Sequence, residues 1–286
     1  MIKFPLRIAL LLTVFLTSGF AFAQDFQGKA YYMSKTTMDM DGIGGPDASP
    51  ERKKQIAERM KSFLEKEYIL TFNREASIYK EEEVLEASTG GRGGFGGFAS
   101  SFTGGPKYKN VKSKELLQDQ EFFGKQFLIK DELADLKWTM SGESKQIGNY
   151  TVFKATAVKQ LTGFDFSSFR PGGRGGDTEK EKEEEETKEP KTVNVVAWYT
   201  MQIPVNQGPD DYWGLPGLIL EVSAGNTTIL CTKVVMNPKD KDKIDKPDKG
   251  EVVTQQEYTE ITTKKMQELR ESRGRGGRGG RGGRRN

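Results

Sequence analysis

The chain has 286 residues, a length that suits one large domain or two small ones. It contains no histidine and one cysteine, which excludes Ser-His-Asp and Cys-His catalysis, imidazole metal sites, intramolecular disulfides and cysteine-cluster metal sites. The formal net charge of +3 combines an acidic body with a basic C-terminus, because residues 270–286 hold seven Arg and one Glu. These counts place binding or assembly ahead of catalysis.

The first 23 residues have the pattern of a secretory signal peptide. Lys3 and Arg7 form a basic start, residues 8–20 are apolar, and an A-x-A cleavage site ends at Ala23. The apolar stretch is short for a membrane helix. We therefore expect an exported protein, periplasmic or associated with the outer membrane, that is cleaved after Ala23. An uncleaved anchor is the alternative.

Three segments differ in composition from the rest of the chain: residues 90–105, residues 171–191 and the Arg-Gly-Gly tail at 270–286. Glycine-rich and like-charged stretches bury little apolar surface, so we expect all three to be disordered or mobile. The predicted organisation is a signal peptide, one domain over residues 24–269 with two mobile insertions, and a disordered tail. Arg-Gly-Gly repeats are typical of single-strand nucleic-acid binders, but export argues against nucleic acid. An anionic surface is the alternative partner for the tail, as is no fixed partner.

The remaining chain is mostly β in pattern. Short runs rich in β-branched and aromatic residues, separated by turn signals, predict strands. Ala224-Gly225-Asn226 predicts the hairpin turn between the last two of them. The expected strands are Gly28–Ser34, Tyr68–Asn73, Ala76–Glu81, Glu121–Ile129, Leu136–Ser141, Tyr150–Val158, Val193–Ile203, Leu218–Val222 and Thr227–Val235.

Two helices are expected beside these strands. The first begins with Ser49 as its N-cap and Pro50 in its first turn, and we expect its apolar stripe to pack on a sheet face. The second covers about Gln255–Glu271 and has apolar positions at Tyr258, Ile261, Met266 and Leu269. The predicted fold is mainly β (α+β), a curved antiparallel sheet or half-barrel with one or two packing helices.

The most distinctive stretch of the sequence is Ala197–Val222. It predicts a strand, a loop and a second strand, because Pro204 cannot donate to a sheet ladder. The segment around Pro216 and Gly217 suits a type II turn, in which proline fixes φ and glycine supplies a positive φ. Leu218 then returns the chain to the core.

These residues resemble the GLPGLI family of secreted Bacteroidetes proteins. The family's hexapeptide stands here as Gly214, Leu215, Pro216, Gly217, Leu218 and Ile219. The family's lead-in resembles Ala197-Trp198-Tyr199, Ile203-Pro204 and Gly208-Pro209, and its upstream element resembles Ile147-Gly148-Asn149-Tyr150 with Lys154-Ala155. The resemblance implies export, a β-rich domain over about Gly28–Leu269 and no established activity. Family members often carry a cysteine where this chain has Val152, so no role here rests on that thiol.

Aromatic and apolar side chains beside the hexapeptide are the candidate contacts for a ligand or partner: Trp198, Tyr212, Trp213 and Leu215. Clustered aromatics are enriched among binding hot spots. The alternative is that the hexapeptide only folds a turn into the core, and this is the favoured interpretation.

Three further groups of side chains could carry chemistry. Asp210-Asp211 is the best candidate for an acid–base pair, but a solvated turn pair is favoured. Met33, Met38 and Met40 could offer thioethers to copper(I), although a strand-core role is favoured for Met33. Cys231 lies in an apolar run and is expected to be a buried thiol. We therefore predict no catalytic residue, no metal site and no cofactor.

The favoured function is a non-enzymatic exported envelope protein that binds an apolar ligand or a protein segment on a β-sheet face. The comparison with periplasmic lipid- or lipoprotein-carrier folds is by analogy. One alternative is an accessory interaction protein of an outer-membrane transport assembly, which would use the acidic body and basic tail as contacts. A carboxylate-dependent enzyme is the other.

Overall fold

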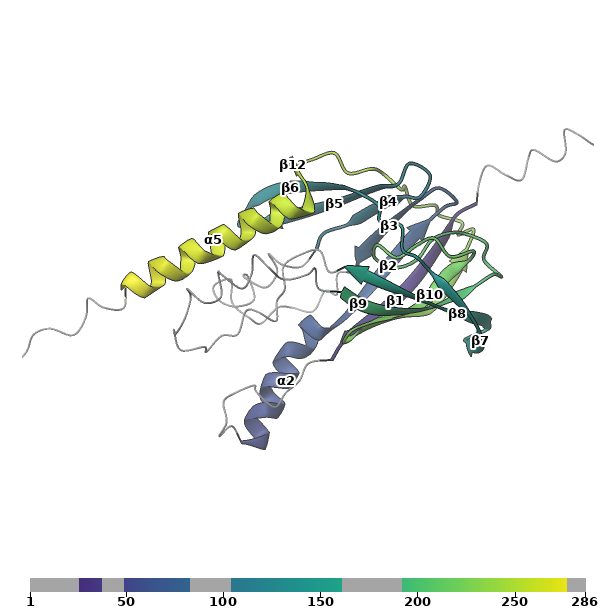
Figure 1. The fold of residues 1–286 in the computed structure, drawn as a ribbon, viewed down its shortest axis with the longest axis horizontal. Coiled ribbons are helices and arrows are strands. Elements are labelled where there is room, and N and C mark those ends of the chain that lie inside the picture. Colours follow the sequence, from purple (N-terminus) through teal and green to yellow (C-terminus); the bar gives the residue numbers. More distant parts are fainter. Residues whose placement is uncertain (1–25, 38–48, 83–103, 161–191, 277–286) are drawn as a thin grey trace, which may run out of the picture.

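The computed structural model describes residues 26–37, 49–82, 104–160 and 192–276 (Figure 1). This part of the chain forms one β-sheet and two helices. In chain order the elements are β1 (Gly28–Thr36), α2 (Pro50–Leu64), β2 (Glu65–Phe72), β3 (Ala76–Glu81), β4 (Lys107–Asn110), β5 (Glu115–Phe122), β6 (Lys125–Glu132), β7 (Thr139–Ile147), β8 (Tyr150–Gln160), β9 (Thr192–Thr200), β10 (Leu218–Ala224), β11 (Thr227–Met236), β12 (Glu251–Val253) and α5 (Gln255–Gly276).

The sheet has twelve strands in the order β12-β6-β5-β4-β3-β2-β1-β11-β10-β9-β8-β7 and stays open. Two meanders, β1 to β6 and β7 to β11, are joined by antiparallel pairing of β1 with β11, in which Gly28 lies opposite Met236. Figure 1 shows the sheet as strongly curved. The predicted mainly β fold with a curved sheet is confirmed. One correction concerns the far edge, where β12 runs parallel to β6 and makes the sheet mixed.

Most of the predicted strands are confirmed, but residues 121–129 do not form one strand. A tight turn at Phe123 (φ 50°) and Gly124 (φ 78°) separates β5 from β6 there. Two residues in the left-handed region are what a two-residue hairpin turn requires. The prediction was wrong because Phe-Gly lacks the usual Asn-Gly signal and apolar residues flank it on both sides. Strands β4 and β12 were not predicted.

The first helix begins as its sequence predicts. The side chain of Ser49 accepts a hydrogen bond from the backbone N–H of Arg52 at 3.3 Å, and Pro50 follows it. α2 runs directly into β2 and contacts β1 and β2. The side chains of Ala57, Met60 and Phe63, on the predicted apolar stripe, lie outside the described residues.

The second helix packs on the inner face of the sheet near its β12 edge. Met266 is buried there against Phe122 and Phe127, and Tyr258 meets the ring of Phe127 edge to face at 5.4 Å. Ile261 and Leu269 also pack on this cluster, so the predicted apolar positions of α5 are confirmed. Within the described residues, no helix is long and apolar enough to cross a membrane.

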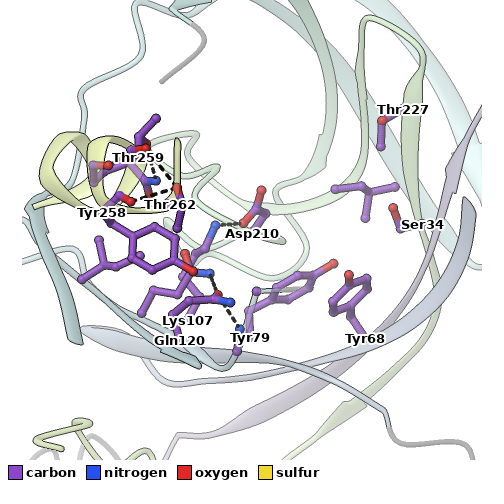
Figure 2. Close-up of a pocket in the computed structure, with 16 residues that line it drawn as sticks. Ser34, Tyr68, Tyr79, Lys107, Gln120, Asp210, Thr227, Tyr258, Thr259 and Thr262 are labelled. Carbon is purple, nitrogen blue, oxygen red and sulfur yellow. Dashed lines mark hydrogen bonds and ion pairs between the residues drawn. The ribbon is translucent and has the colours of Figure 1, made fainter. Parts of the chain in front are cut away.

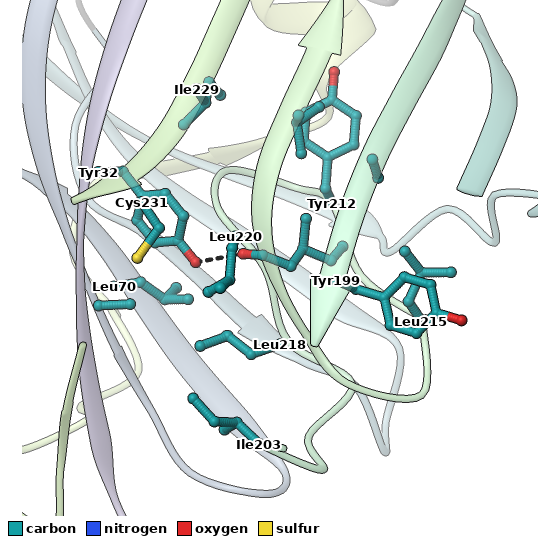
Figure 3. Close-up of a cluster of buried hydrophobic side chains, with 14 of the residues drawn as sticks. Tyr32, Leu70, Tyr199, Ile203, Tyr212, Leu215, Leu218, Leu220, Ile229 and Cys231 are labelled. Carbon is teal, nitrogen blue, oxygen red and sulfur yellow. Dashed lines mark hydrogen bonds between the residues drawn. The ribbon is translucent and has the colours of Figure 1, made fainter. Parts of the chain in front are cut away.

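The main core lies on the concave face of the sheet (Figure 3). Ala30 and Tyr32 of β1 point into it, whereas Lys29 and Met33 of the same strand point outward. The Tyr32 hydroxyl donates to the backbone oxygen of Ile219 at 2.7 Å and ties β1 to β10. This alternation is what a half-buried strand predicts.

Residues 237–250 connect β11 to β12 across the convex face. Ile244 packs against a second cluster that includes Tyr108 and Leu117, and Lys246 forms an ion pair with Glu115 at 2.8 Å. The crossing explains how β12 reaches the far edge and why its direction matches that of β6. The predicted signal peptide, most of the two insertions and residues 277–286 of the tail lie outside the described residues.

Candidate functional site

Residues 201–217, between β9 and β10, form a loop that folds back onto the concave face. Ile203, Val205 and Leu215 anchor this loop in the main core, where each is at most 3% exposed. Backbone hydrogen bonds close it, as Leu218 N donates to Ile203 O at 2.9 Å and Ile219 N donates to Gln207 O at 3.0 Å. The most distinctive stretch of the sequence is therefore an inner layer of the fold.

The glycines of this loop act differently from the prediction. Gly214 has the positive φ (90°), whereas Gly217 is outside the left-handed region, so the expected type II turn with positive φ at Gly217 is wrong. Gly217 is required for space instead. A Cβ atom there would lie 2.1 Å from the backbone oxygen of Thr200, because the two backbones approach closely where β10 begins beside β9.

A buried lysine from β4 holds the loop. Lys109 is 0% exposed, and its Nζ donates to the backbone oxygens of Gly208 at 2.6 Å and Tyr212 at 2.9 Å. Burial disfavours the ammonium form and lowers the pKa of Lys109 to about 7, although the charges of Asp211 and Asp210 oppose this shift. Lys109 therefore ties β4 to the loop through two main-chain bonds.

The two carboxylates of the loop are each paired with a lysine. Asp210, at φ 51°, accepts a hydrogen bond from Lys107 of β4. Asp211 pairs with Lys159 of β8 at 2.6 Å, and the same Lys159 Nζ lies 4.6 Å from the ring centroid of Tyr212. The favoured prediction of a solvated turn pair is thus wrong, because strands from two parts of the sheet supply a counter-charge to each aspartate.

This pairing fixes the charge states. Burial alone would raise the pKa of Asp210, but the charges of Lys107 and Lys159 and the hydrogen bond from Lys107 outweigh it and lower the pKa to about 2. Burial would lower the pKa of Lys107, and the charges of Asp210 and Asp211 raise it. Both partners stay ionised at neutral pH, so neither is poised to exchange a proton.

A cavity of about 360 Å³ opens beside this ion pair (Figure 2). Strand residues line one side of it, including Ser34 of β1, Tyr68 of β2 and Tyr79 of β3. Residues of α5, among them Tyr258 and Thr262, line the opposite side. Figure 2 shows Lys107 and Asp210 between these two sides. The volume lies within the range of small-molecule sites.

The four candidate contact residues lie around the loop, not in the cavity wall. Tyr212, Trp213 and Leu215 are 6%, 8% and 0% exposed, and Trp198 is partly buried with Lys145 Nζ 4.3 Å from its ring centroid. Tyr212 and Leu215 belong to the main core, against which Trp198 packs. A direct ligand or partner contact by these four residues stays a prediction.

Two tryptophans connect the loop to the segment before β7. The Trp213 indole donates to the backbone oxygen of Ala134 at 2.8 Å, and the Trp138 indole donates to the backbone oxygen of Trp213 at 2.8 Å. Two indole–carbonyl bonds, one donated by Trp213 and one accepted by it, therefore hold Trp213 in its buried position. These bonds satisfy the polar end of each ring inside the fold.

Sequence reasoning missed the residues that form the cavity and its charges. Lys107 and Lys109 lie on a four-residue strand whose sequence is mostly polar. Because buried lysines are rare, no sequence pattern predicts that these two side chains turn inward. Tyr68 and Tyr79 fell within predicted strands, so their alternation could have placed them on one inner face.

The cysteine and the methionines that the sequence singled out differ in how well their predictions hold. Cys231 is a free, buried thiol with its pKa raised by burial to about 12, as expected for a core cysteine. Met33 is 42% exposed, so the favoured strand-core role for it is wrong, and Met38 and Met40 lie outside the described residues. Among the described residues, no group of three or more Cys, Asp or Glu side chains could hold a metal ion.

A family model described as "Protein of unknown function (Porph_ging)" matches residues 138–221. This match includes β7 to β9, most of β10 and the whole loop at 201–217. It covers the hexapeptide and its upstream element, and the GLPGLI name remains a resemblance. No curated protein matches the chain.

Two solved structures of PNGF-II are similar to this chain. The form in space group C2 has 14% sequence identity and a TM-score of 0.45, and the matched region covers 84% of this chain and 32% of the PNGF-II chain. The form in space group P21 has 14% identity and a TM-score of 0.44, with 84% and 33% covered. The chain therefore spans about a third of the length of these structures.

Proposed function

We propose that the protein is an exported binding protein, without catalysis of its own, that holds a small ligand in the concave cavity. The observation that carries this proposal is the cavity itself, about 360 Å³ with walls from both meanders of the sheet and from α5. A site built from elements far apart in sequence depends on the complete fold. Cavities of this size and construction are typical ligand sites.

The charged groups beside the cavity support binding over catalysis. Lys107 and Asp210 neutralise each other, and Lys109 is occupied by two main-chain oxygens. These groups hold the loop at 201–217, which contributes Asp210 to the cavity wall. A general acid or base needs a pKa near the working pH and access to the substrate, and fully buried Lys109, whose pKa is about 7, lacks that access.

The cavity wall also refines the kind of ligand. Among the lining residues that the structure describes, Ile129 and Ile229 contribute the aliphatic side chains, and most of the others are tyrosine, threonine, serine and glutamine. Several of these groups already have partners inside the protein, but a purely apolar ligand would leave the buried Tyr79 hydroxyl without one, which is costly. The ligand we propose is therefore partly polar and meets both aromatic rings and hydrogen-bonding groups.

Export is part of the proposal and rests on the signal-like residues 1–23. An exported binding protein would meet its ligand in the periplasm or at the outer membrane. The N-terminal sequence of the mature protein checks this point, and we expect it to begin at Gln24.

A bulky substitution in the cavity tests the ligand site. Ser34→Trp places an indole in the cavity, whereas Lys35→Trp on the same strand places it on the outer face. We expect native mass spectrometry of the full chain to show a bound small molecule in the wild type and in Lys35→Trp, and none in Ser34→Trp. Circular dichroism would establish that both variants are folded. Equal ligand occupancy in both variants, or no bound molecule in any of the three proteins, would contradict the proposal.

A further inference from the structure

We infer that the cavity takes a neutral, polyhydroxylated ligand of the size of a small saccharide. This inference rests on the proposed function and names the class of ligand. Four features of the wall carry it: its hydroxyl and amide groups, its balanced charge, an unpartnered tyrosine hydroxyl and stacked aromatic rings.

Side chains that end in a hydroxyl or amide group are the most frequent among the described lining residues of the cavity. Of its sixteen lining residues, seven carry a hydroxyl group and three are glutamines. Ser34, Tyr68 and Tyr79 supply hydroxyls from the strands, and Thr259 and Thr262, whose hydroxyls donate to backbone oxygens of α5, can accept hydrogen bonds from the other side (Figure 2). Hydroxyl groups both donate and accept hydrogen bonds. Such a wall matches a ligand that carries hydroxyl groups on several sides.

The formal charge of the wall is balanced. Among the described residues of the wall, Lys107 and Asp210 are the charged ones, and they form an ion pair with each other. An anionic ligand would have to compete with Asp210 for Lys107, and a cationic ligand would have to compete with Lys107 for Asp210. A ligand without net charge avoids both costs of breaking a partly buried pair.

One buried hydroxyl group of the wall has no hydrogen-bond partner among the described residues. Tyr79 is 5% exposed, and its buried hydroxyl makes no hydrogen bond, whereas the Tyr32 hydroxyl two strands away donates to Ile219 O at 2.7 Å. Burial raises the pKa of Tyr79 well above its usual value, so its hydroxyl remains a donor at neutral pH. A buried hydroxyl without a partner costs free energy. A ligand oxygen that accepts this hydrogen bond would recover that cost.

The same tyrosine belongs to an aromatic stack. The rings of Tyr68 and Tyr79 lie 4.6 Å apart with planes 12° from parallel, and both line the cavity. The two rings cover each other on one side, so an outer face of the pair is what remains for the C–H face of a sugar ring, with the hydroxyls at the polar end. The wall therefore combines an aromatic pair with hydroxyl partners around it.

Calorimetric titration of the full chain tests this inference. The neutral probes are glucose, N-acetylglucosamine, cellobiose and maltose, with glucuronate as the anionic probe and laurate as the apolar probe. We expect at least one neutral saccharide to bind, glucuronate to bind at least about tenfold more weakly, and laurate not to bind. Tyr79→Phe should weaken saccharide binding about tenfold, the effect of one lost hydrogen bond.

Tyr32→Phe is the matched control, because it removes a hydroxyl that is already used inside the core. It should lower the melting temperature and leave saccharide affinity within about twofold, whereas Tyr79→Phe should leave the melting temperature unchanged or raise it. Binding of laurate in place of saccharides, blocked by Ser34→Trp, would overturn this inference and leave the proposed function standing. Unchanged affinity in Tyr79→Phe would also overturn it. If no probe binds and no molecule copurifies, both fail.

Discussion

At the scale of single residues, Lys109 shows how a buried charge can serve the fold. A neutral amine has two N–H donors, and Lys109 Nζ has two carbonyl acceptors at hydrogen-bond distance. When Lys109 loses its proton, near its lowered pKa of about 7, both of these hydrogen bonds can therefore remain. The side chain can hold the loop at 201–217 in either protonation state.

The lowered pKa predicts how stability depends on pH. Between about pH 7 and the ordinary lysine value of 10.5, the unfolded chain binds a proton at Lys109 that the folded chain has released. The free energy of unfolding should therefore rise with pH in this window, and the rise should be absent from Lys109→Met. Chemical denaturation from pH 7 to pH 9, below the ordinary titration of tyrosine, measures the difference between the two proteins.

Lys109→Met should also destabilise the protein at pH 7. It leaves the backbone oxygens of Gly208 and Tyr212 without a donor, which should cost about 1–3 kcal/mol. Lys112→Met, on a lysine whose side chain is 74% exposed, should change stability by less than about 0.5 kcal/mol. A smaller effect at Lys109 than at Lys112 would contradict the role assigned to the buried lysine.

The contacts of single residues were also the features that the sequence predicted least well. Its pattern identified the buried thiol of Cys231 and the capping role of Ser49, because both depend on local composition. The ion pairs of Asp210 and Asp211 depend on lysines from β4 and β8, more than fifty residues away in the chain. Only the register of distant strands brings those charges together.

At the scale of elements, the loop at 201–217 depends on close backbone approach. Gly217→Ala would bring a Cβ atom to 2.1 Å from Thr200 O, and we expect it to destabilise the protein by about 3 kcal/mol, the upper end of overpacking costs. Because this contact is with backbone, a side-chain rotation cannot relieve it. Thermal unfolding of the variant measures the effect.

Gly142→Ala is the matched control for that substitution. Gly142 lies in β7, and an added Cβ would meet no atom within 4 Å. We expect a change of about 0.5 kcal/mol or less, since a strand position with open space accepts alanine. Equal destabilisation at both glycines would show that space at Gly217 is not the reason for its presence.

Elements with a clear period were predicted well, and those with short or polar sequences were not. β1, β3, β8 and β11 alternate or carry β-branched runs, and the apolar spacing of α5 matches its buried side. β5 and β6 merged into one prediction because the turn at Phe123 and Gly124 has no standard sequence signal. β12 has only three residues, and it is a strand because β6 offers it a free edge.

At the scale of the whole molecule, the pairing of β1 with β11 determines the architecture. It joins two local meanders into one curved sheet, so that the loop at 201–217 from the second meander lies against β4 of the first. Local sequence predicts the hairpins within each meander, but not which edges meet. The concave cavity follows from that junction and from α5, which is why it could not be located from the sequence.

The central claim is that this cavity is a ligand site, and methyl NMR tests it most directly. Ile129 and Ile229 are the aliphatic residues in the described part of its wall, whereas Ile244 packs on the convex face. Molecules released by denaturing the purified protein would be added back to ligand-free protein with labelled isoleucine methyl groups. We predict shifts at Ile129 and Ile229 with Ile244 unchanged. Shifts centred on Ile244, or no shift at the two cavity residues, would contradict the account.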